Sequence, residues 1–200
     1  MSKGELPGAV TADPTDEMLI AAVQHGDEAA FAVIVDRYKD LLMNFAVRYL
    51  GDYDEAEDVV QETFVRVYFK SNSYTPVAKF STWIYTITGN LAKSRLRQKK
   101  IGRVLSLFRK NSSDDETEGE IPDRAILPDQ ETERLLENDL IQRALDELPA
   151  AHREVIVLCD IEERTYEEVC AITGLNMGTV KSRLNRGRTA LKGKLADIRT

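Results

Sequence analysis

The chain has 200 residues, 42% of them hydrophobic, and this size allows one large or two small packed domains. Its formal net charge of −7 at pH 7 is the opposite of what a uniformly basic DNA-binding protein shows. No apolar run approaches the roughly 20 residues that span a bilayer. The N-terminus has no hydrophobic signal segment, so we expect a cytoplasmic protein without membrane insertion.

The first half of the chain predicts helices and no strands, because its apolar residues recur at helical spacing. The expected helices span residues 15–25, 28–50, 54–70 and 80–100. The second helix carries a continuous apolar stripe formed by Phe31, Ile34, Tyr38, Leu41, Leu42, Phe45 and Tyr49. A polar loop, residues 71–79, separates the last two helices.

The fourth helix has an apolar side with Trp83, Ile84, Ile87 and Leu91. This spacing favours Trp83 as a core residue over Trp83 as a stacking platform for a base. Gly89 within the same helix costs about 1 kcal/mol relative to alanine, and the close approach of another backbone would explain it.

Charge is segregated along the chain. Residues 91–110 carry eight basic side chains and no acid, and residues 181–200 are again basic, whereas residues 114–139 are acidic. Local potential, and not the total charge, steers a polyanion to a surface. The negative total still predicts that the free protein binds duplex DNA weakly.

A second helical domain follows an acidic stretch without periodicity. Residues 111–134 are rich in Asp, Glu, Ser and Pro, which is typical of a flexible linker. The predicted organisation is all-α, with two small helical domains joined by this linker. The segments are a disordered tail at 1–14, a first domain at 15–108, a linker at 109–134 and a second domain at 135–200.

Residues 165–192 predict two short helices joined by a tight turn, the layout of a helix-turn-helix. Thr165 and Glu168 have the spacing of a capping box. Gly174 suits a left-handed C-cap, and Asn176 can cap the second helix. In that helix Val180, Leu184 and Leu191 fall on one side. Cys170 is expected where the two helices cross.

The opposite side of the second helix carries small, amide and basic residues, which suit contacts to base edges and phosphates. They are Gly178, Ser182, Asn185 and Arg186, flanked by Lys181 and Arg183. A solvated basic surface helix is the alternative for such a stretch taken alone. The capped preceding helix and the spacing from Gly174 to Val180 favour DNA binding.

Metal and catalytic chemistry are not expected. Cys159 and Cys170 form no CxxC pair and are expected to be reduced and buried. His25 and His152 are isolated from each other and from the cysteines. The pattern contains no metal-ligand set and no nucleophile–base pair, so we expect no cofactor and no enzyme activity.

The chain from about residue 15 to 195 resembles the extracytoplasmic-function (ECF) sigma factors of bacteria. Three segments carry the resemblance: DYDEAEDVVQETFVRVY (52–68), FSTWIYTITGNLAKSRLR (80–97) and TYEEVCAITGLNMGTVKSRLNRGRTALK (165–192). They are similar, in order, to a helix that docks on the clamp coiled coil of RNA polymerase, a segment that handles the −10 element and a reader of the −35 element. The resemblance implies a non-catalytic factor that binds core polymerase, selects promoters and promotes melting.

The resemblance also implies three sets of site residues. Polymerase-binding residues would be Asp54, Asp58, Gln61, Glu62 and Arg66, where a solvated acidic face is the alternative. Single-stranded −10 DNA would contact Asn72, Ser73, Tyr74, Lys79, Asn90, Lys93 and Arg97. Duplex −35 DNA would contact Gly178, Thr179, Lys181, Ser182, Arg183, Asn185 and Arg186. Members often differ at Thr86, Gly89 and Ser94, so the base contacts of that helix stay open.

Further partners follow only from the resemblance: the polymerase flap and an anti-sigma factor that masks both domains. The acidic linker is either a solubilising tether or a segment that threads through the polymerase near the transcript. A two-domain regulator that binds duplex operators directly is the main alternative function. A helical enzyme using Asp54, Glu57 and Asp58 is a weaker one, because these acids have no histidine partner.

Overall fold

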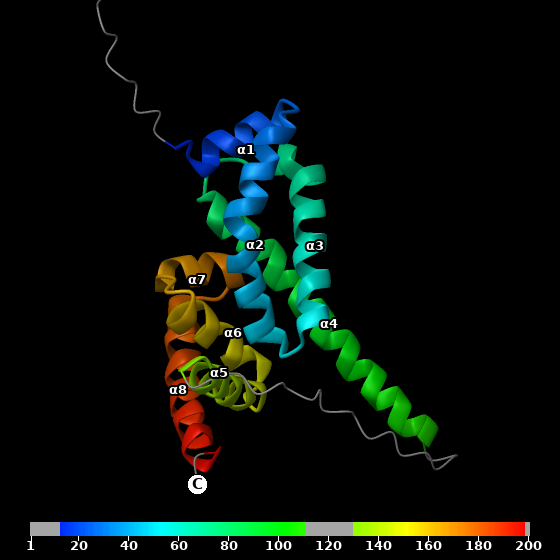
Figure 1. Cartoon of the computed structure of the whole chain (residues 1–200), viewed down its shortest axis with the longest axis vertical. Coiled ribbons are helices and arrows are strands. Elements are labelled where there is room, and N and C mark those ends of the chain that lie inside the picture. The colour runs from blue at the N-terminus through cyan, green and yellow to red at the C-terminus, as the bar shows by residue number, and fades with distance from the viewer. Residues whose placement is uncertain (1–12, 111–129, 199–200) are drawn as a thin grey trace, which may run out of the picture.

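The computed structural model describes residues 13–110 and 130–198 (Figure 1), and every regular element within these two ranges is helical. The all-α expectation is therefore confirmed. The predicted tail (1–14) and linker (109–134) lie largely outside the described residues. Helix α5 nevertheless begins at Gln130, so residues 130–134, expected in the linker, are helical.

The N-terminal module consists of four α-helices and one short 3-10 turn. They are α1 (Asp16–Gln24), α2 (Glu28–Leu50), α3 (Tyr53–Lys70), η1 (Ser71–Ser73) and α4 (Phe80–Lys110). Side-chain oxygens of Thr15, Asp27 and Asp52 cap the first three α-helices. Gly51 ends α2 with a φ of 73°, a left-handed conformation that glycine adopts readily. Helix α4 continues ten residues past the predicted end at 100.

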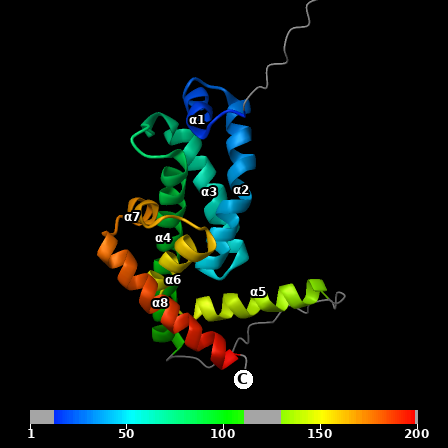
Figure 2. The ribbon, with the colours of Figure 1, turned by 90° about the vertical axis from the view of Figure 1, so that its left-hand side faces the viewer.

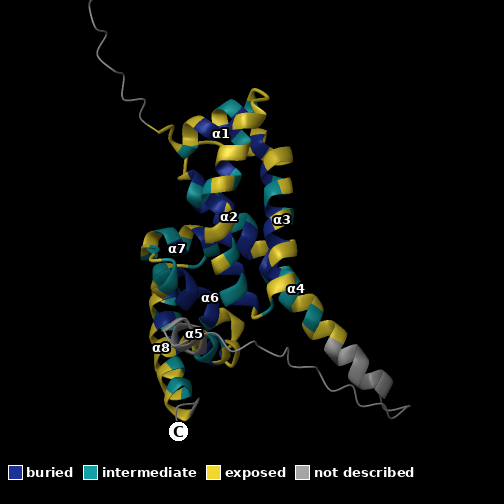
Figure 3. Ribbon diagram, viewed as in Figure 1, coloured by how far each residue is buried: buried dark blue, intermediate teal, exposed yellow. Residues whose placement is uncertain are grey.

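The core of this module lies between α2, α3 and α4. Ile34, Leu42, Phe45, Phe80 and Tyr85 are fully or almost fully buried there. Figure 3 shows the buried stripe running along the inner sides of these helices. Leu41 departs from the predicted stripe of α2, because its side chain is 45% exposed.

The C-terminal module contains α5 (Gln130–Asp146), α6 (Ala150–Ile156), a π-helical turn η2 (Val157–Ile161), α7 (Tyr166–Thr173) and α8 (Met177–Ile198). Helices α7 and α8 form the predicted helix-turn-helix. Thr165 and Glu168 make both bonds of the capping box, and Gly174 has a φ of 72°. Asn176 Oδ1 accepts a hydrogen bond from the Thr179 amide at 2.8 Å, as expected of an N-cap.

Helices α6 and α8 approach each other closely at Gly187, and Cys170, expected where α7 and α8 cross, is half-buried and packs against the core. A Cβ atom at Gly187 would lie 2.6 Å from Ile156 Cδ1 and 3.1 Å from Ile156 Cγ1. Gly89 is different: its neighbours would be Glu154 Oε1 at 3.7 Å and the Phe45 ring at 4.0 Å. Among the described residues no backbone of another element lies within 4 Å of that position, so the expected close approach of a backbone is not what the structure shows at Gly89.

We expect Gly187→Ala to lower the free energy of unfolding by about 1 kcal/mol. Overpacking against Ile156 costs about 1–3 kcal/mol, while alanine regains about 1 kcal/mol of helix propensity. Gly89→Ala, the matched control, should raise stability by up to about 1 kcal/mol, because an added methyl fits there. Urea unfolding followed by circular dichroism measures both changes. Equal signs for the two variants would contradict the assignment of Gly187 as the tight crossing.

The two modules pack against each other in this structure. Figure 2 shows α7 beside α4 and α5 across the end of α2, and residues of these pairs are in contact. The buried apolar residues form one cluster that runs from α1 to α8. The predicted DNA-binding segments therefore lie near one another, which determines the geometry of the candidate interface.

Candidate nucleic-acid interface

The second helix of the helix-turn-helix presents most of its predicted contacts to solvent. Gly178, Lys181, Asn185 and Arg186 are exposed, and Thr179 and Ser182 are half-buried. Arg188 is not available in the same way, because its guanidinium pairs with Asp160 at 2.5 and 2.9 Å. The face thus offers the exposed cations Lys181 and Arg186 and two small or amide positions to a groove, with Lys181 Nζ 5.9 Å from the centroid of the Tyr166 ring.

Arg183, the remaining predicted −35 contact, lies apart from that face. Together with Lys93 and Arg97 of α4 it lines a cavity of about 510 Å³ between the modules. The apolar part of the same cavity includes Leu96 and Leu175. One cavity therefore joins residues predicted for two different promoter elements.

The loop predicted to form the −10 pocket is partly folded inward. Asn72, Ser73 and Lys79 are exposed, but Tyr74 is only 7% exposed. The Tyr74 ring centroid lies 5.3 Å from that of Trp83, and its hydroxyl donates to Ala78 O at 2.9 Å. Trp83 itself is half-buried against the core, as predicted. The Tyr74 ring has no free face for a base in this conformation.

The α4 residues of the −10 set differ in their environment. Asn90 and Arg97 are exposed, whereas Lys93 Nζ lies 2.8 Å from Glu154 Oε1 of α6. Burial raises the pKa of Glu154 above its usual range, and Lys93 opposes that shift. In the loop, Lys79 Nζ pairs with Glu168 Oε1 at 3.0 Å, which holds the pKa of Glu168 below its usual range.

The predicted docking ridge lies on the outer side of α3. Asp54, Asp58 and Gln61 are exposed, and Arg66 Nε pairs with Glu62 Oε1 at 2.8 Å. Asp58 lies 3.5 Å from Arg95 of α4, a long contact that leaves its side chain 60% exposed. A buried inner face holds these side chains in position, and they stay at least partly exposed to a partner even where they pair within the module.

The sequence reasoning missed an apolar extension of this ridge. Val65 and Phe69 are 50% and 78% exposed, and with Phe31, Phe64 and Tyr68 they line a groove of about 400 Å³. Val65 follows Gln61 by one helical turn and Phe69 follows Val65 by another. This continuation at four-residue spacing is the signal that could have identified them.

The described residues contain no group of three or more His, Cys, Asp or Glu side chains placed to hold a metal ion. Within the same residues, no helix combines the length and apolarity that crossing a membrane requires. Both cysteines are free, but they are half-buried and not fully buried as expected, and burial raises the pKa of the Cys159 thiol to about 11.

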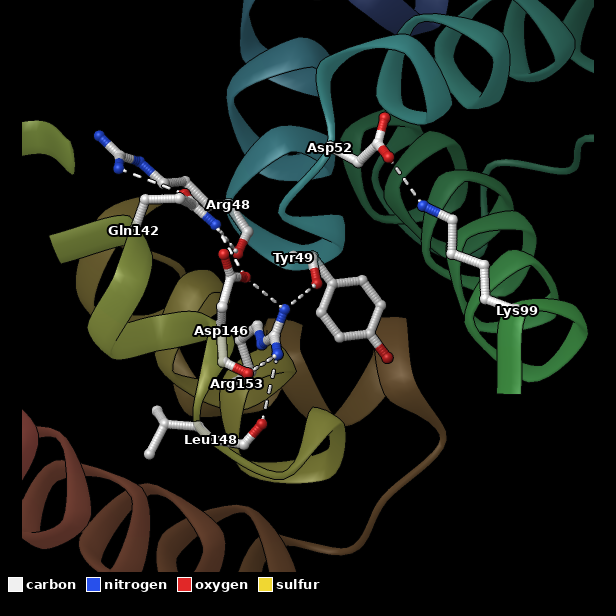
Figure 4. A network of polar contacts seen from close by, with 8 residues as sticks. All are labelled: Arg48, Tyr49, Asp52, Lys99, Gln142, Asp146, Leu148 and Arg153. Carbon is white, nitrogen blue, oxygen red and sulfur yellow. Dashed lines mark hydrogen bonds and ion pairs between the residues drawn. The ribbon is translucent and has the colours of Figure 1, made fainter. Parts of the chain in front are cut away.

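A polar network joins the modules at the end of α2 (Figure 4). Arg153 of α6 is buried and donates to Tyr49 O at 3.0 Å, Asp146 O at 2.6 Å, Leu148 O at 3.3 Å and Asp146 Oδ1 at 2.8 Å. Arg48 donates to Asn138 O and Oδ1 at 3.2 and 2.9 Å. Asp52 accepts from Lys99 at 2.8 Å on the other side of the junction, and this bond lowers the pKa of Asp52.

Known sequences match both modules. A family model described as Sigma-70 region 2 matches residues 34–101, and one described as Sigma-70, region 4 matches residues 138–191. The chain is 38% identical over 179 residues to the ECF RNA polymerase sigma factor SigW of Bacillus subtilis (strain 168), covering 90% of this chain and 96% of SigW. It is 36% identical over 193 residues to the ECF sigma factor SigE of Mycolicibacterium smegmatis, covering 92% and 70%.

Solved structures share the fold. RpoE of Bartonella quintana, crystallised with the anti-sigma factor NepR, has a TM-score of 0.62 and 27% identity, covering 83% of this chain and 96% of RpoE. CnrH, solved with the cytosolic domain of CnrY, has a TM-score of 0.67 at 24% identity, covering 91% and 97%, and shows the fold alone. With two sigma regions in order and SigW matched at 38% identity over 96% of its length, the chain belongs to the ECF sigma factors of the sigma-70 family.

Proposed function

We propose that this chain binds core RNA polymerase, recognises the −10 and −35 elements of promoters and promotes DNA melting at transcription initiation. The observation that carries this proposal is the match to both sigma regions in their proper order, each with an exposed polar face on the expected helix. The family consists of promoter-recognising initiation factors, and we assign the chain no catalytic role of its own.

The polymerase contact is assigned to the outer side of α3. Asp54, Asp58, Gln61, Glu62 and Arg66 present carboxylates, an amide and a guanidinium that suit charge-assisted hydrogen bonds. The exposed Val65 and Phe69 beside them add apolar surface that a partner would desolvate. We propose that these polar and apolar side chains of α3 contact the clamp coiled coil of the polymerase. The C-terminal module would contact the flap.

The promoter contacts are assigned to two helices and a loop. Asn72, Ser73, Lys79, Asn90, Lys93 and Arg97 would follow the single-stranded −10 element, with Tyr74 as a pocket wall once its loop rearranges. Gly178, Thr179, Lys181, Ser182, Arg183, Asn185 and Arg186 would contact duplex at −35. The −10 set and the −35 set each contain residues that can contact phosphates and residues that can contact base edges.

An anti-sigma factor is proposed as a further partner because the RpoE structure that shares this fold contains one. A factor of this family acts on DNA in the interior of the cell, and we propose the cytoplasm as its location.

Reconstitution with core polymerase tests the proposed function. Run-off transcription on fragmented genomic DNA should yield defined start sites only when the chain is added to core polymerase. The chain alone should leave no footprint on the same fragments at physiological salt, since its net charge is −7. A footprint by the free chain without any stimulation of polymerase would favour the operator-binding regulator instead.

We expect Arg186→Ala to weaken transcription from promoters that depend on their −35 element while leaving polymerase binding unchanged. Arg186 is exposed, and a lost contact to a base edge costs about 1–3 kcal/mol. Transcription should therefore fall by about 5- to 150-fold. Lys192→Ala, which removes an exposed cation farther along α8, is the control. A loss of polymerase affinity in Arg186→Ala would contradict the assignment of this helix.

A further inference from the structure

Helix α1, which contains none of the predicted site residues, bonds to both ends of the loop predicted to form the −10 pocket. The side-chain amide of Gln24 donates hydrogen bonds to Ser71 O at 2.8 Å and to Tyr74 O at 3.1 Å. About two helical turns earlier in α1, Glu17 Oε1 accepts a hydrogen bond from the Phe80 amide at 3.2 Å. The loop therefore begins and ends at residues that are bonded to one short helix.

These contacts satisfy backbone groups that the regular structure around the loop leaves over. Ser71 O already accepts from the Tyr74 amide at 2.9 Å, so the Gln24 amide uses its second acceptor position. The Phe80 amide belongs to the first turn of α4 and has no partner within its own helix. Ser71 and Phe80 are 5% and 0% exposed. Unpaired polar groups at such buried residues are costly, so the contacts from α1 stabilise this shape of the loop.

Helix α1 is itself fixed to the rest of the N-terminal module. Asp16, its first residue, accepts a hydrogen bond from the Tyr38 hydroxyl of α2 at 2.5 Å. Glu17 and Gln24 are seven residues apart, so their side chains leave the helix on the same side. Three apolar side chains of α1 are buried in the core: Leu19, Ile20 and Val23. Both loop contacts therefore come from a helix that cannot shift without disturbing the core.

The exposed polar residues at the start of the loop lie between the two carbonyls that Gln24 binds. Asn72 and Ser73 are exposed, and the backbone on either side of them is held by the same side chain. The rest of the loop, residues 75–79, is also exposed and receives one hydrogen bond from the Tyr74 hydroxyl. A rearrangement that frees the Tyr74 ring can thus occur in residues 75–79 while the backbone around Asn72 and Ser73 keeps its shape.

We propose that Gln24 and Glu17 are positioning residues for recognition of the −10 element, because they fix the shape of the loop and thereby the base that it accepts. The inference rests on the proposed function through the assignment of this loop to single-stranded −10 DNA. Neither side chain has to touch DNA in this role. A binding pocket discriminates only while supporting hydrogen bonds hold it near its productive geometry, so weaker support loosens the choice of base.

Paired variants of the full chain separate the hydrogen bonds from the bulk of the side chains. Q24M keeps an unbranched side chain and removes both donated bonds, whereas Q24K restores a donor through its ammonium group. E17M removes the acceptor for the Phe80 amide, whereas E17Q keeps a carbonyl oxygen there. Q142M is the matched control, because Gln142 donates to Arg48 O at 3.5 Å and to Asp146 Oδ1 at 3.1 Å, outside the −10 set.

Base preference within the −10 element is the readout that a merely structural role would not move. Core polymerase with each variant transcribes a promoter found by the run-off experiment, its −10 element randomised, and transcripts are counted by base at each position. Q24M should lower the preference at one position at least about fivefold, the low end for two lost hydrogen bonds. E17M should lower it at the same position. Q24K, E17Q and Q142M should keep the wild-type preference.

Hydrogen exchange of the free chain measures the support of the loop without DNA or polymerase. Peptides covering residues 71–80 should exchange at least about fivefold faster in Q24M than in the wild type, and Q24K should restore the slower rate. Unchanged exchange in both Q24M and E17M overturns the proposal, because α1 then does not hold the loop.

Two further results would also overturn the positioning role. Faster exchange with an unchanged base preference would make Gln24 and Glu17 structural residues only. An equal loss of preference at every −10 position, or the same loss in Q142M, would reflect general damage to the fold. Failure of the proposed function would look different, since wild-type chain with core polymerase would then give no defined start sites, and the inference would fall with it.

Discussion

Replacing Arg153 with alanine should lower the free energy of unfolding of the C-terminal module by about 3 kcal/mol or more. The guanidinium is 9% exposed and satisfies Tyr49 O, Asp146 O and Leu148 O as well as the Asp146 carboxylate. Burial lowers the pKa of Arg153, yet Asp146 keeps the charge in place. Without the side chain these buried carbonyls lose their donors, at about 1–3 kcal/mol each.

Two probes separate this effect from general destabilisation. The chain has one tryptophan, Trp83, which lies in the N-terminal module, whereas far-UV circular dichroism reports all helices. The Arg153→Ala variant should lower the melting temperature of the circular dichroism signal by more than about 10 °C and shift Trp83 fluorescence less. Arg143→Ala, which removes an exposed ion pair with Asp139, should change stability by about 0.5 kcal/mol at most. Equal effects of the two variants would contradict the role given to the buried network.

Local patterns made the helix-turn-helix predictable. The capping box at Thr165 and Glu168, the left-handed Gly174 and the Asn176 cap each depend on residues within one or two turns of each other. Each of these features depends only on neighbouring residues, so it can be recognised in the sequence without the tertiary structure. The apolar faces of α2 and α3 were predictable for the same reason, with Leu41 as an exception at the edge of its stripe.

The junction between the modules was not predictable, because its contacts join distant parts of the chain. Asn44 and Glu162 are 118 positions apart, and neither lies in a sequence pattern that predicts contact with the other. Gly187 likewise has no local signature, since only the approach of Ile156 from α6 requires a glycine there. Tyr74 could be placed in its loop from sequence, but only the tertiary structure shows its ring packed against Trp83.

Replacing Asp58 with alanine should weaken association with core polymerase about 30-fold or more. On the outer side of α3, Asp58 lies one helical turn after Asp54 and two turns before the exposed Val65. Truncating a charged group that is buried and hydrogen-bonded in a complex typically costs about 2–5 kcal/mol of binding free energy. A cost of about 1.4 kcal/mol corresponds to a tenfold loss of affinity. Fluorescently labelled chain titrated with core polymerase measures the dissociation constant directly.

The fold itself should tolerate this change, which makes the experiment a test of docking. Asp58 is 60% exposed and its contact with Arg95 is long, at 3.5 Å, so its loss should alter stability by less than about 1 kcal/mol. Asp36→Ala on α2 removes an equally charged side chain, 78% exposed and paired with Lys39, and should leave polymerase binding unchanged. If Asp58→Ala bound as tightly as Asp36→Ala, the carboxylates of α3 would form a solvated face and the clamp contact would lie elsewhere on the module.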